Sequence, residues 1–134
     1  MNIQLDYDEI LIYVKKKFNI GPTIKMVDNK TLRIIYKIGI FVPTINVDLH
    51  VDAISKDTLT LSYSCSDIAN GLLKGVIGLV GEKNPKHQVE ISTEKKQVLV
   101  HLNAFKELDQ VFMIVEPTDI VFSKDAIILN MVLV

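Results

Sequence analysis

The chain has 134 residues, of which 49% are hydrophobic and 23% are charged. This length fits one domain spanning residues 1–134, and the apolar content excludes intrinsic disorder because there is enough apolar surface to bury. Fifteen basic against sixteen acidic residues leave a net charge of −1, which argues against a nucleic-acid-binding protein, since such proteins gain affinity from excess positive charge.

Sequence features that would direct the chain to a membrane or a secretory route are absent from these residues. No apolar run reaches the roughly 20 residues that a transmembrane helix needs, so we expect no transmembrane segment. The first residues lack the basic stretch and following apolar run of a signal peptide. The single cysteine, Cys65, cannot form an internal disulfide. These features predict a cytoplasmic protein.

The first predicted element is a helix over residues 6–19. Its apolar residues recur at the three-and-four spacing of one helical face; they are Tyr7, Ile10, Leu11, Val14 and Phe18. We expect Asp6 to cap the helix, with Glu9 completing a capping box. The three lysines at 15–17 suit the last turn, where the helix dipole favours positive charge. We expect the sequence Gly21-Pro22 to end the helix.

From Ile24 onward the apolar residues alternate with polar ones, as in strands with one buried face. The alternation shifts by one residue near Pro43. Because the residues from Phe41 to Thr44 are poor turn formers, we favour one long strand over 31–54 with a bulge near Pro43 over a tight hairpin there. A strand of that length must coil, which predicts a strongly curved sheet.

Short loops predict the register of several hairpins, because apolar residues must fall on the same face. The expected cross-strand pairs are Met26 with Leu32, Leu49 with Tyr63, Val51 with Leu61, Ala53 with Leu59, Ile91 with Val98, and Phe122 with Ile127. The chain contains about seven or eight strand segments in this interpretation. They are joined mainly by hairpins, which indicates an antiparallel sheet.

A second predicted helix spans residues 67–81 and carries an unusual stripe of glycines. Ser66 or Asp67 would cap it, and Gly71, Gly75 and Gly78 line one flank of its apolar face. Three interior glycines cost a helix roughly 2–3 kcal/mol relative to alanine. Three explanations remain open: close packing of the helix on a strand, a groove that admits a long apolar ligand, or a helix lying on a membrane surface.

Residue types that usually carry catalysis or bind metals do not form a recognisable site. Asp48, His50 and Asp52 share one strand face, but neighbours on that face lie about 6.5–7 Å apart and would need ligands from another strand. We expect them to form a solvated polar face, and Cys65 to be a small buried side chain. Phosphate-binding loops and nucleophile elbows are absent from the sequence. We therefore predict no enzyme activity, no metal site and no cofactor.

The order and character of these elements resemble the tubular lipid-binding (TULIP-like) superfamily. The resemblance is carried by the strand run 31–54, the helix 67–81 and the terminal hairpin 119–134. It implies an apolar groove between helix and sheet that binds acyl chains or similar molecules.

The expected fold is an α+β domain whose strongly curved antiparallel sheet, of about seven or eight strand segments, packs on helices 6–19 and 67–81. The leading expected function is non-enzymatic binding of a lipid-like or other apolar ligand in a groove between helix 67–81 and the sheet, by burial of apolar surface. The expected ligand-binding residues are Leu72, Leu73, Gly75, Val76, Ile77, Gly78 and Val80.

The alternative function is a protein-interaction or assembly module, acting on a protein partner or as a homo-oligomer. Such a module would use an exposed strand edge or apolar side chains on the otherwise polar sheet face. The apolar residues at those positions are Ile35, Phe41, Ile128 and Val132.

Overall fold

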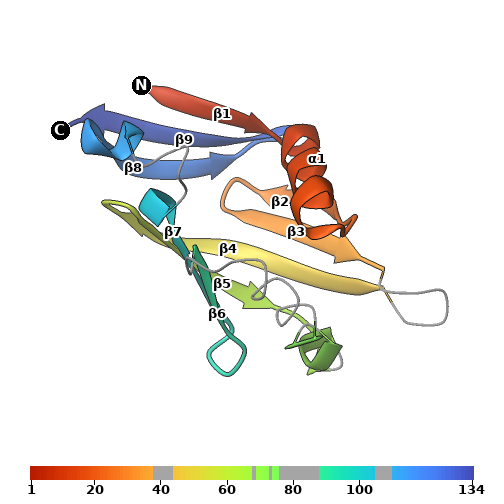
Figure 1. Ribbon diagram of the computed structural model, residues 1–134. Coiled ribbons are helices and arrows are strands. Elements are labelled where there is room, and N and C mark those ends of the chain that lie inside the picture. Colours follow the sequence, from red (N-terminus) through yellow and green to blue (C-terminus); the bar gives the residue numbers. More distant parts are fainter. Residues whose placement is uncertain (38–43, 68, 73, 76–87, 105–109) are drawn as a thin grey trace.

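The computed structural model describes residues 1–37, 44–67, 69–72, 74–75, 88–104 and 110–134. Their elements follow one another along the chain as β1 (Asn2–Asp6), α1 (Tyr7–Phe18), β2 (Thr23–Asp28), β3 (Thr31–Tyr36), β4 (Ile45–Ser55), β5 (Thr58–Ser64), β6 (Val89–Ser92), β7 (Gln97–His101), the 3-10 turns η1 (Leu102–Ala104) and η2 (Val111–Met113), β8 (Val115–Phe122) and β9 (Ala126–Leu133) (Figure 1). A second helix lies between β5 and β6, and its described residues are 67, 69–72 and 74–75.

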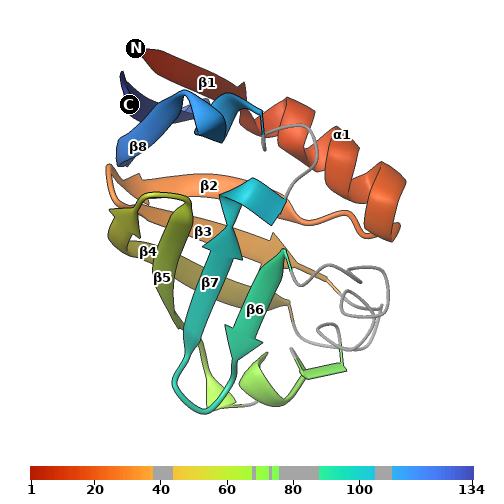
Figure 2. The ribbon, with the colours of Figure 1, turned by 60° about the vertical axis from the view of Figure 1, so that its left-hand side comes forward.

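The strands of the described residues form two antiparallel sheets, and the fold is α+β as predicted. One sheet has the order β1-β9-β8, and the other has the order β2-β3-β4-β5-β7-β6. The prediction of one sheet with about seven or eight strand segments is therefore wrong, since the nine strands of the described ranges divide between two sheets. Figures 1 and 2 both show β8 of the smaller sheet on the side facing β2 and β4 of the larger one.

The first element is a strand, which corrects the prediction that the chain begins with a helix. In β1, Ile3 lies opposite Leu129 of β9 and Leu5 lies opposite Ile127. The alternation of these two apolar residues with polar ones is the strand signal, and it is too short to be decisive on its own. The partner strand β9 comes from the far end of the chain, and pairing with it makes β1 an edge strand of the smaller sheet.

Helix α1 follows as predicted, but its ends are built differently from the expectation. Asp6 occupies the N-cap position without a side-chain capping hydrogen bond, so the expected capping box is not formed. The Tyr7 N–H instead donates to the Asp125 carbonyl at 3.0 Å. The helix closes at Asn19, which adopts a left-handed conformation (φ 56°) and donates from its N–H to the Lys15 carbonyl at 3.0 Å.

Strands β3 and β4 are antiparallel neighbours, so the predicted single long strand over 31–54 is wrong. Tyr36 lies opposite Ile45 and Ile34 lies opposite Val47. In this register even positions of β3 face odd positions of β4. The one-residue shift of the apolar pattern is therefore the consequence of chain reversal, not of a bulge. Pro43, where the bulge was predicted, lies outside the described residues.

Most of the predicted hairpin pairs are confirmed. The confirmed pairs are Met26 with Leu32, Leu49 with Tyr63, Val51 with Leu61, Ile91 with Val98, and Phe122 with Ile127. The pair of Ala53 with Leu59 is wrong, because a register shift after Val51 places Leu59 opposite Ile54. The turn between β4 and β5 therefore consists of Lys56 and Asp57, with Lys56 in a left-handed conformation (φ 50°).

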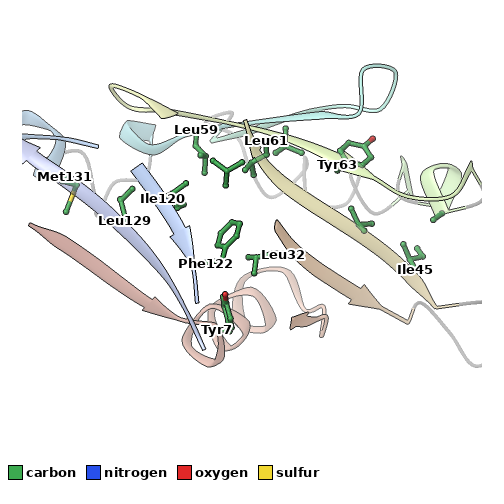
Figure 3. Packing of buried hydrophobic residues seen from close by; sticks show 14 of the residues in the cluster. Tyr7, Leu32, Ile45, Leu59, Leu61, Tyr63, Ile120, Phe122, Leu129 and Met131 are labelled. Carbon is green, nitrogen blue, oxygen red and sulfur yellow. The ribbon is translucent and has the colours of Figure 1, made fainter. Parts of the chain in front are cut away.

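The core lies between the two sheets and continues along the inner face of the larger sheet. Figure 3 shows Phe122 of β8 pointing towards Leu32 of β3 and Tyr7 of α1, with Leu59 and Leu61 of β5 nearby. All five side chains are at most 7% exposed. Burial of these side chains therefore joins α1, the smaller sheet and the larger sheet into one hydrophobic cluster.

Candidate functional site

A pocket of about 190 Å³ lies on the inner, apolar face of the larger sheet. Its described lining residues are Ile34, Val47, Leu49, Tyr63, Ile91 and Val98, which come from β3, β4, β5, β6 and β7. The lining surface that these residues offer is entirely apolar. A ligand in this pocket would therefore meet hydrocarbon and the ring of Tyr63, with no hydrogen-bonding group to satisfy.

The pocket walls arise from strand pairing, because the six lining residues form three cross-strand pairs. Ile34 faces Val47, Leu49 faces Tyr63, and Ile91 faces Val98. In an antiparallel sheet such partners lie on the same face, about 4.5–5.5 Å apart at their Cβ atoms. The alternation in the sequence thus fixes the apolar character of the pocket, but none of the six residues was predicted as a ligand-binding residue.

The start of the second helix is attached to one wall of this pocket. The Tyr63 hydroxyl donates to Asn70 Oδ1 at 2.9 Å, and Asn70 Nδ2 donates to the Thr93 carbonyl at 3.4 Å. Burial raises the pKa of the Tyr63 hydroxyl, and the nearby Cys65 adds to the effect. Asn70 therefore ties the helix both to β5 and to the turn between β6 and β7.

Ser66 caps this helix, which resolves the predicted choice between Ser66 and Asp67. Its Oγ accepts a hydrogen bond from the Ala69 N–H at 3.1 Å. Ala69 is buried, and Leu72 packs partly buried against the same hydrophobic cluster as the pocket residues Val47 and Tyr63. The first turns of the helix are thus held on the inner face of the larger sheet.

The residues predicted to bind the ligand divide into two described and five undescribed positions. Leu72 packs on the core, whereas Gly75 is exposed. The other five, namely Leu73, Val76, Ile77, Gly78 and Val80, lie outside the described residues. A side chain added at Gly71 or Gly75 would meet no atom of the described residues within 4 Å. Close packing on a strand of the described part of the chain therefore does not explain these two glycines.

A second, larger pocket of about 270 Å³ lies between the β4–β5 turn and the start of β8. Its described lining residues are Lys56, Asp57, Phe112, Val115, Glu116 and Val134. Three of these six side chains are charged. Asp57 is already engaged, since its carboxylate accepts from Asn103 Nδ2 and its carbonyl from the Leu102 N–H. This pocket is less suited to an apolar ligand.

The outer face of the larger sheet is lined by separate polar pairs. Arg33 Nε donates to Asp48 at 2.8 Å, and its guanidinium pKa is raised by that hydrogen bond. His50 Nδ1 lies 2.9 Å from Thr31 Oγ1, while Asp52 accepts from Ser62 Oγ at 3.0 Å. The three residues considered for a metal site thus have three different partners. Within the described ranges, no group of three or more His, Cys, Asp or Glu side chains is arranged to hold a metal ion.

The residues expected to serve the alternative, protein-interaction function differ in their exposure. Ile35 and Ile128 are half-buried, Val132 is 50% exposed, and Phe41 lies outside the described residues. Cys65 is half-buried at the edge of the core, where full burial was expected. In the described part of the chain, every helix falls short of the length and apolar content that crossing a membrane requires.

Comparison with known proteins adds no further assignment. The chain matches no protein-family model, no curated protein and no solved structure.

Proposed function

We propose that the chain binds a lipid-like or other apolar ligand, without catalysing a reaction on it, in the apolar pocket of the larger sheet. The observation that carries the proposal is the pocket itself, which three cross-strand pairs line with apolar surface alone. The second helix supports the proposal, because its Asn70 accepts a hydrogen bond from the pocket residue Tyr63 and its Leu72 packs against the hydrophobic core. A wholly apolar recess of this kind stabilises hydrocarbon by removing it from water.

The energetics favour an alkyl chain over a polar guest. Each buried methylene contributes about 0.8 kcal/mol, whereas a buried polar group without a partner costs about 1–3 kcal/mol. The 190 Å³ of the pocket equals the volume of about six water-sized groups of roughly 30 Å³ each. The pocket therefore suits the end of an alkyl chain, while the polar head of the ligand stays outside.

The finer features expected from the sequence belong to this proposal. The larger sheet would be strongly curved and would wrap helix 67–81, as the resemblance to the TULIP-like superfamily implies. Leu72 would then begin a wall that Leu73, Val76, Ile77 and Val80 continue, with Gly75 and Gly78 leaving room beside it. These residues would lengthen the recess beyond the six that line the pocket.

The first test is a chain-length series in native mass spectrometry and calorimetry, with fatty acids and the matching alkanols added to the purified chain. We expect affinity to rise about fourfold for each added methylene, because about 0.8 kcal/mol is a little over half of the roughly 1.4 kcal/mol that corresponds to a tenfold change in affinity. The rise should stop once the chain is longer than the pocket. Because the head group is proposed to stay outside the pocket, alkanols should bind as tightly as fatty acids of the same chain length. No adduct at any chain length would contradict the proposal.

A matched pair of variants locates the ligand. Ile34 and Ile35 are adjacent, half-buried isoleucines of β3 that point to opposite faces. Ile34→Trp would fill the pocket and reduce alkyl-chain affinity at least tenfold, whereas Ile35→Trp would leave affinity within about twofold of the unchanged chain. Equal effects of both variants would place the ligand elsewhere.

A further inference from the structure

Among the described residues, the outer edge of strand β1 has no neighbouring strand, and its backbone groups can be assigned individually. The Met131 N–H donates to the Met1 carbonyl at 2.9 Å, and the Tyr7 N–H donates to the Asp125 carbonyl at 3.0 Å. In an antiparallel ladder the hydrogen-bonded positions alternate, so residues 1, 3, 5 and 7 direct their backbone groups towards β9. Asn2, Gln4 and Asp6 therefore direct theirs away from the sheet, and all three residues are exposed.

The edges of β2 and β8 are protected in ways that β1 is not. The edge strand β2 carries an irregularity between Met26 and Asp28 and an exposed lysine, Lys25. The outer edge of β8 meets the β2–β3 turn, where the Phe122 N–H donates to the Asn29 carbonyl at 2.8 Å. Bulges, edge lysines and covering loops are the usual means of preventing strand addition. By contrast, β1 pairs with β9 without a register shift and contains no lysine or proline.

We propose that β1 pairs with β1 of a second copy of this chain, antiparallel and about a twofold axis at Gln4. In this register Gln4 faces Gln4 of the second copy, and Asn2 faces Asp6 of the second copy. All three outward-directed residues then meet outward-directed residues, so each forms a hydrogen-bonded backbone pair. The two smaller sheets join into one continuous sheet of six strands, and the interface is the same patch on both copies.

The side chains along β1 agree with this register. The only charged residue of β1, Asp6, faces the Asn2 amide and never the Asp6 of the other copy. Gln4 meets an identical amide, which can both donate and accept. Gln4 Nε2 already donates to Asp6 Oδ1 within one chain, at 3.3 Å. On the opposite face Leu5, which is 44% exposed, faces Ile3 of the second copy and gains apolar cover.

The surroundings of β1 leave the edge accessible. In Figures 1 and 2 the strand lies at the outer margin of the molecule, and α1 turns away from that margin directly after it. Helix α1 begins at Tyr7, which the register places opposite Met1 of the second copy. The paired segment therefore ends where the helix departs.

Charge substitutions at the twofold axis test the proposal, because Gln4 faces itself. The unchanged chain should form a dimer in sedimentation velocity and light scattering, with a dimer fraction that rises with concentration. Gln4→Lys and Gln4→Glu should each be monomeric, since like charges would face each other. An equimolar mixture of the two variants should recover the dimer. A role of Gln4 in folding alone would not produce this recovery.

Disulfide cross-linking supplies a second, independent readout in a Cys65→Ala background. Paired positions of this kind have Cα atoms about 5.5 Å apart, which a disulfide can span, so Gln4→Cys should form covalent dimers under mild oxidation. Asp6→Cys is the control, because two Asp6 positions would lie about 13 Å apart along the strands. Mixing Asn2→Cys with Asp6→Cys should give a cross-linked heterodimer.

The same experiments define the results that would overturn the proposal. One is a monomer at every concentration of the unchanged chain up to about 1 mM. Another is cross-linking of Gln4→Cys no faster than that of Asp6→Cys. A third is a dimer that both Gln4→Lys and Gln4→Glu retain, which would place the contact between copies elsewhere on the molecule.

Discussion

Lys30, in the turn between β2 and β3, forms an ion pair with Asp119 of β8 and thereby links the two sheets. Its Nζ also donates to the Ile120 carbonyl at 2.6 Å. The Lys30 backbone carbonyl accepts from the Val51 N–H of β4 at 2.9 Å. One residue of the β2–β3 turn is therefore bonded to β4 of the larger sheet and to β8 of the smaller sheet, beside the core in which Phe122 contacts the larger sheet.

Replacing Lys30 should weaken the association of the two sheets. Lys30→Met removes the ion pair and leaves the Ile120 carbonyl without its side-chain donor. We expect a loss of about 1–3 kcal/mol in the free energy of unfolding, measured by urea denaturation. Lys25→Met, at an exposed lysine of β2, is the control and should change stability by less than about 0.5 kcal/mol. Equal stability of the two variants would refute the link.

The contribution of this ion pair should depend on pH in a defined direction. The hydrogen bond from Lys30 is the largest cause that lowers the pKa of Asp119 below its ordinary value of 3.8. Because the folded pKa is depressed, the stabilisation is complete above the unfolded pKa and is lost as pH falls through the folded value. The stability difference between the unchanged chain and Lys30→Met should therefore narrow below pH 3.8. A difference that is constant from neutral pH to pH 3 would contradict the assignment.

The hydroxyl of Tyr63 should matter for stability and not for ligand binding. Tyr63→Phe removes the hydrogen bond to Asn70 and should cost about 0.5–1.5 kcal/mol in the free energy of unfolding. The ring that lines the pocket stays, so alkyl-chain affinity should change less than twofold. Tyr36→Phe is a control within β3, where the hydroxyl has no assigned partner in the described part of the chain. Loss of ligand binding in Tyr63→Phe would show that the hydroxyl reaches the ligand.

Alanine at the exposed helix glycines should stabilise the fold. The added methyl group meets no atom of the described residues within 4 Å at Gly71 or Gly75, and neither residue has a positive φ. Since alanine exceeds glycine in helix propensity by about 0.8–1 kcal/mol, Gly75→Ala should raise the free energy of unfolding by up to that amount. Thermal and urea denaturation measure the effect. If Gly75→Ala instead lowered the free energy of unfolding, the glycine would be needed for close packing of the helix.

Local pattern was sufficient to predict individual elements of this fold. The three-and-four spacing from Tyr7 to Phe18 identifies α1, and the alternation on either side of short turns identifies pairs such as Ile91 with Val98. Both signals depend on residues that are close in sequence. Each signal reflects the side-chain periodicity of a helix or a hairpin, and contacts with distant parts of the chain do not alter that periodicity here.

Features that depend on distant contacts were not predictable in the same way. The five residues of β1 become a strand because β9 pairs with them from the far end of the chain. The packing of the two sheets on each other likewise involves contacts between β8 and the β2–β3 turn that are distant in sequence, such as that of Lys30 with Asp119. The shift near Pro43 was misread because a chain reversal and a bulge change the alternation of side chains identically.

The candidate pocket was missed for a chemical reason. Its lining residues, such as Ile34 and Val98, are ordinary core residue types. Their alternation in the sequence is the same whether the space beside them is filled or empty. The glycine stripe directed attention to the second helix instead, although Gly75 is exposed. Only cross-strand positions identify which apolar residues share the recess.

The most direct test of the central claim is methyl NMR of the chain with isotope-labelled isoleucine and valine methyl groups and an added alkyl ligand. Intermolecular nuclear Overhauser effects from the ligand chain to the methyl groups of Ile34, Val47 and Val98, and none to those of Ile35, are the predicted result. Contacts to Ile35 alone, or unchanged methyl spectra at saturating ligand, would contradict an apolar binding site on the inner face of the larger sheet.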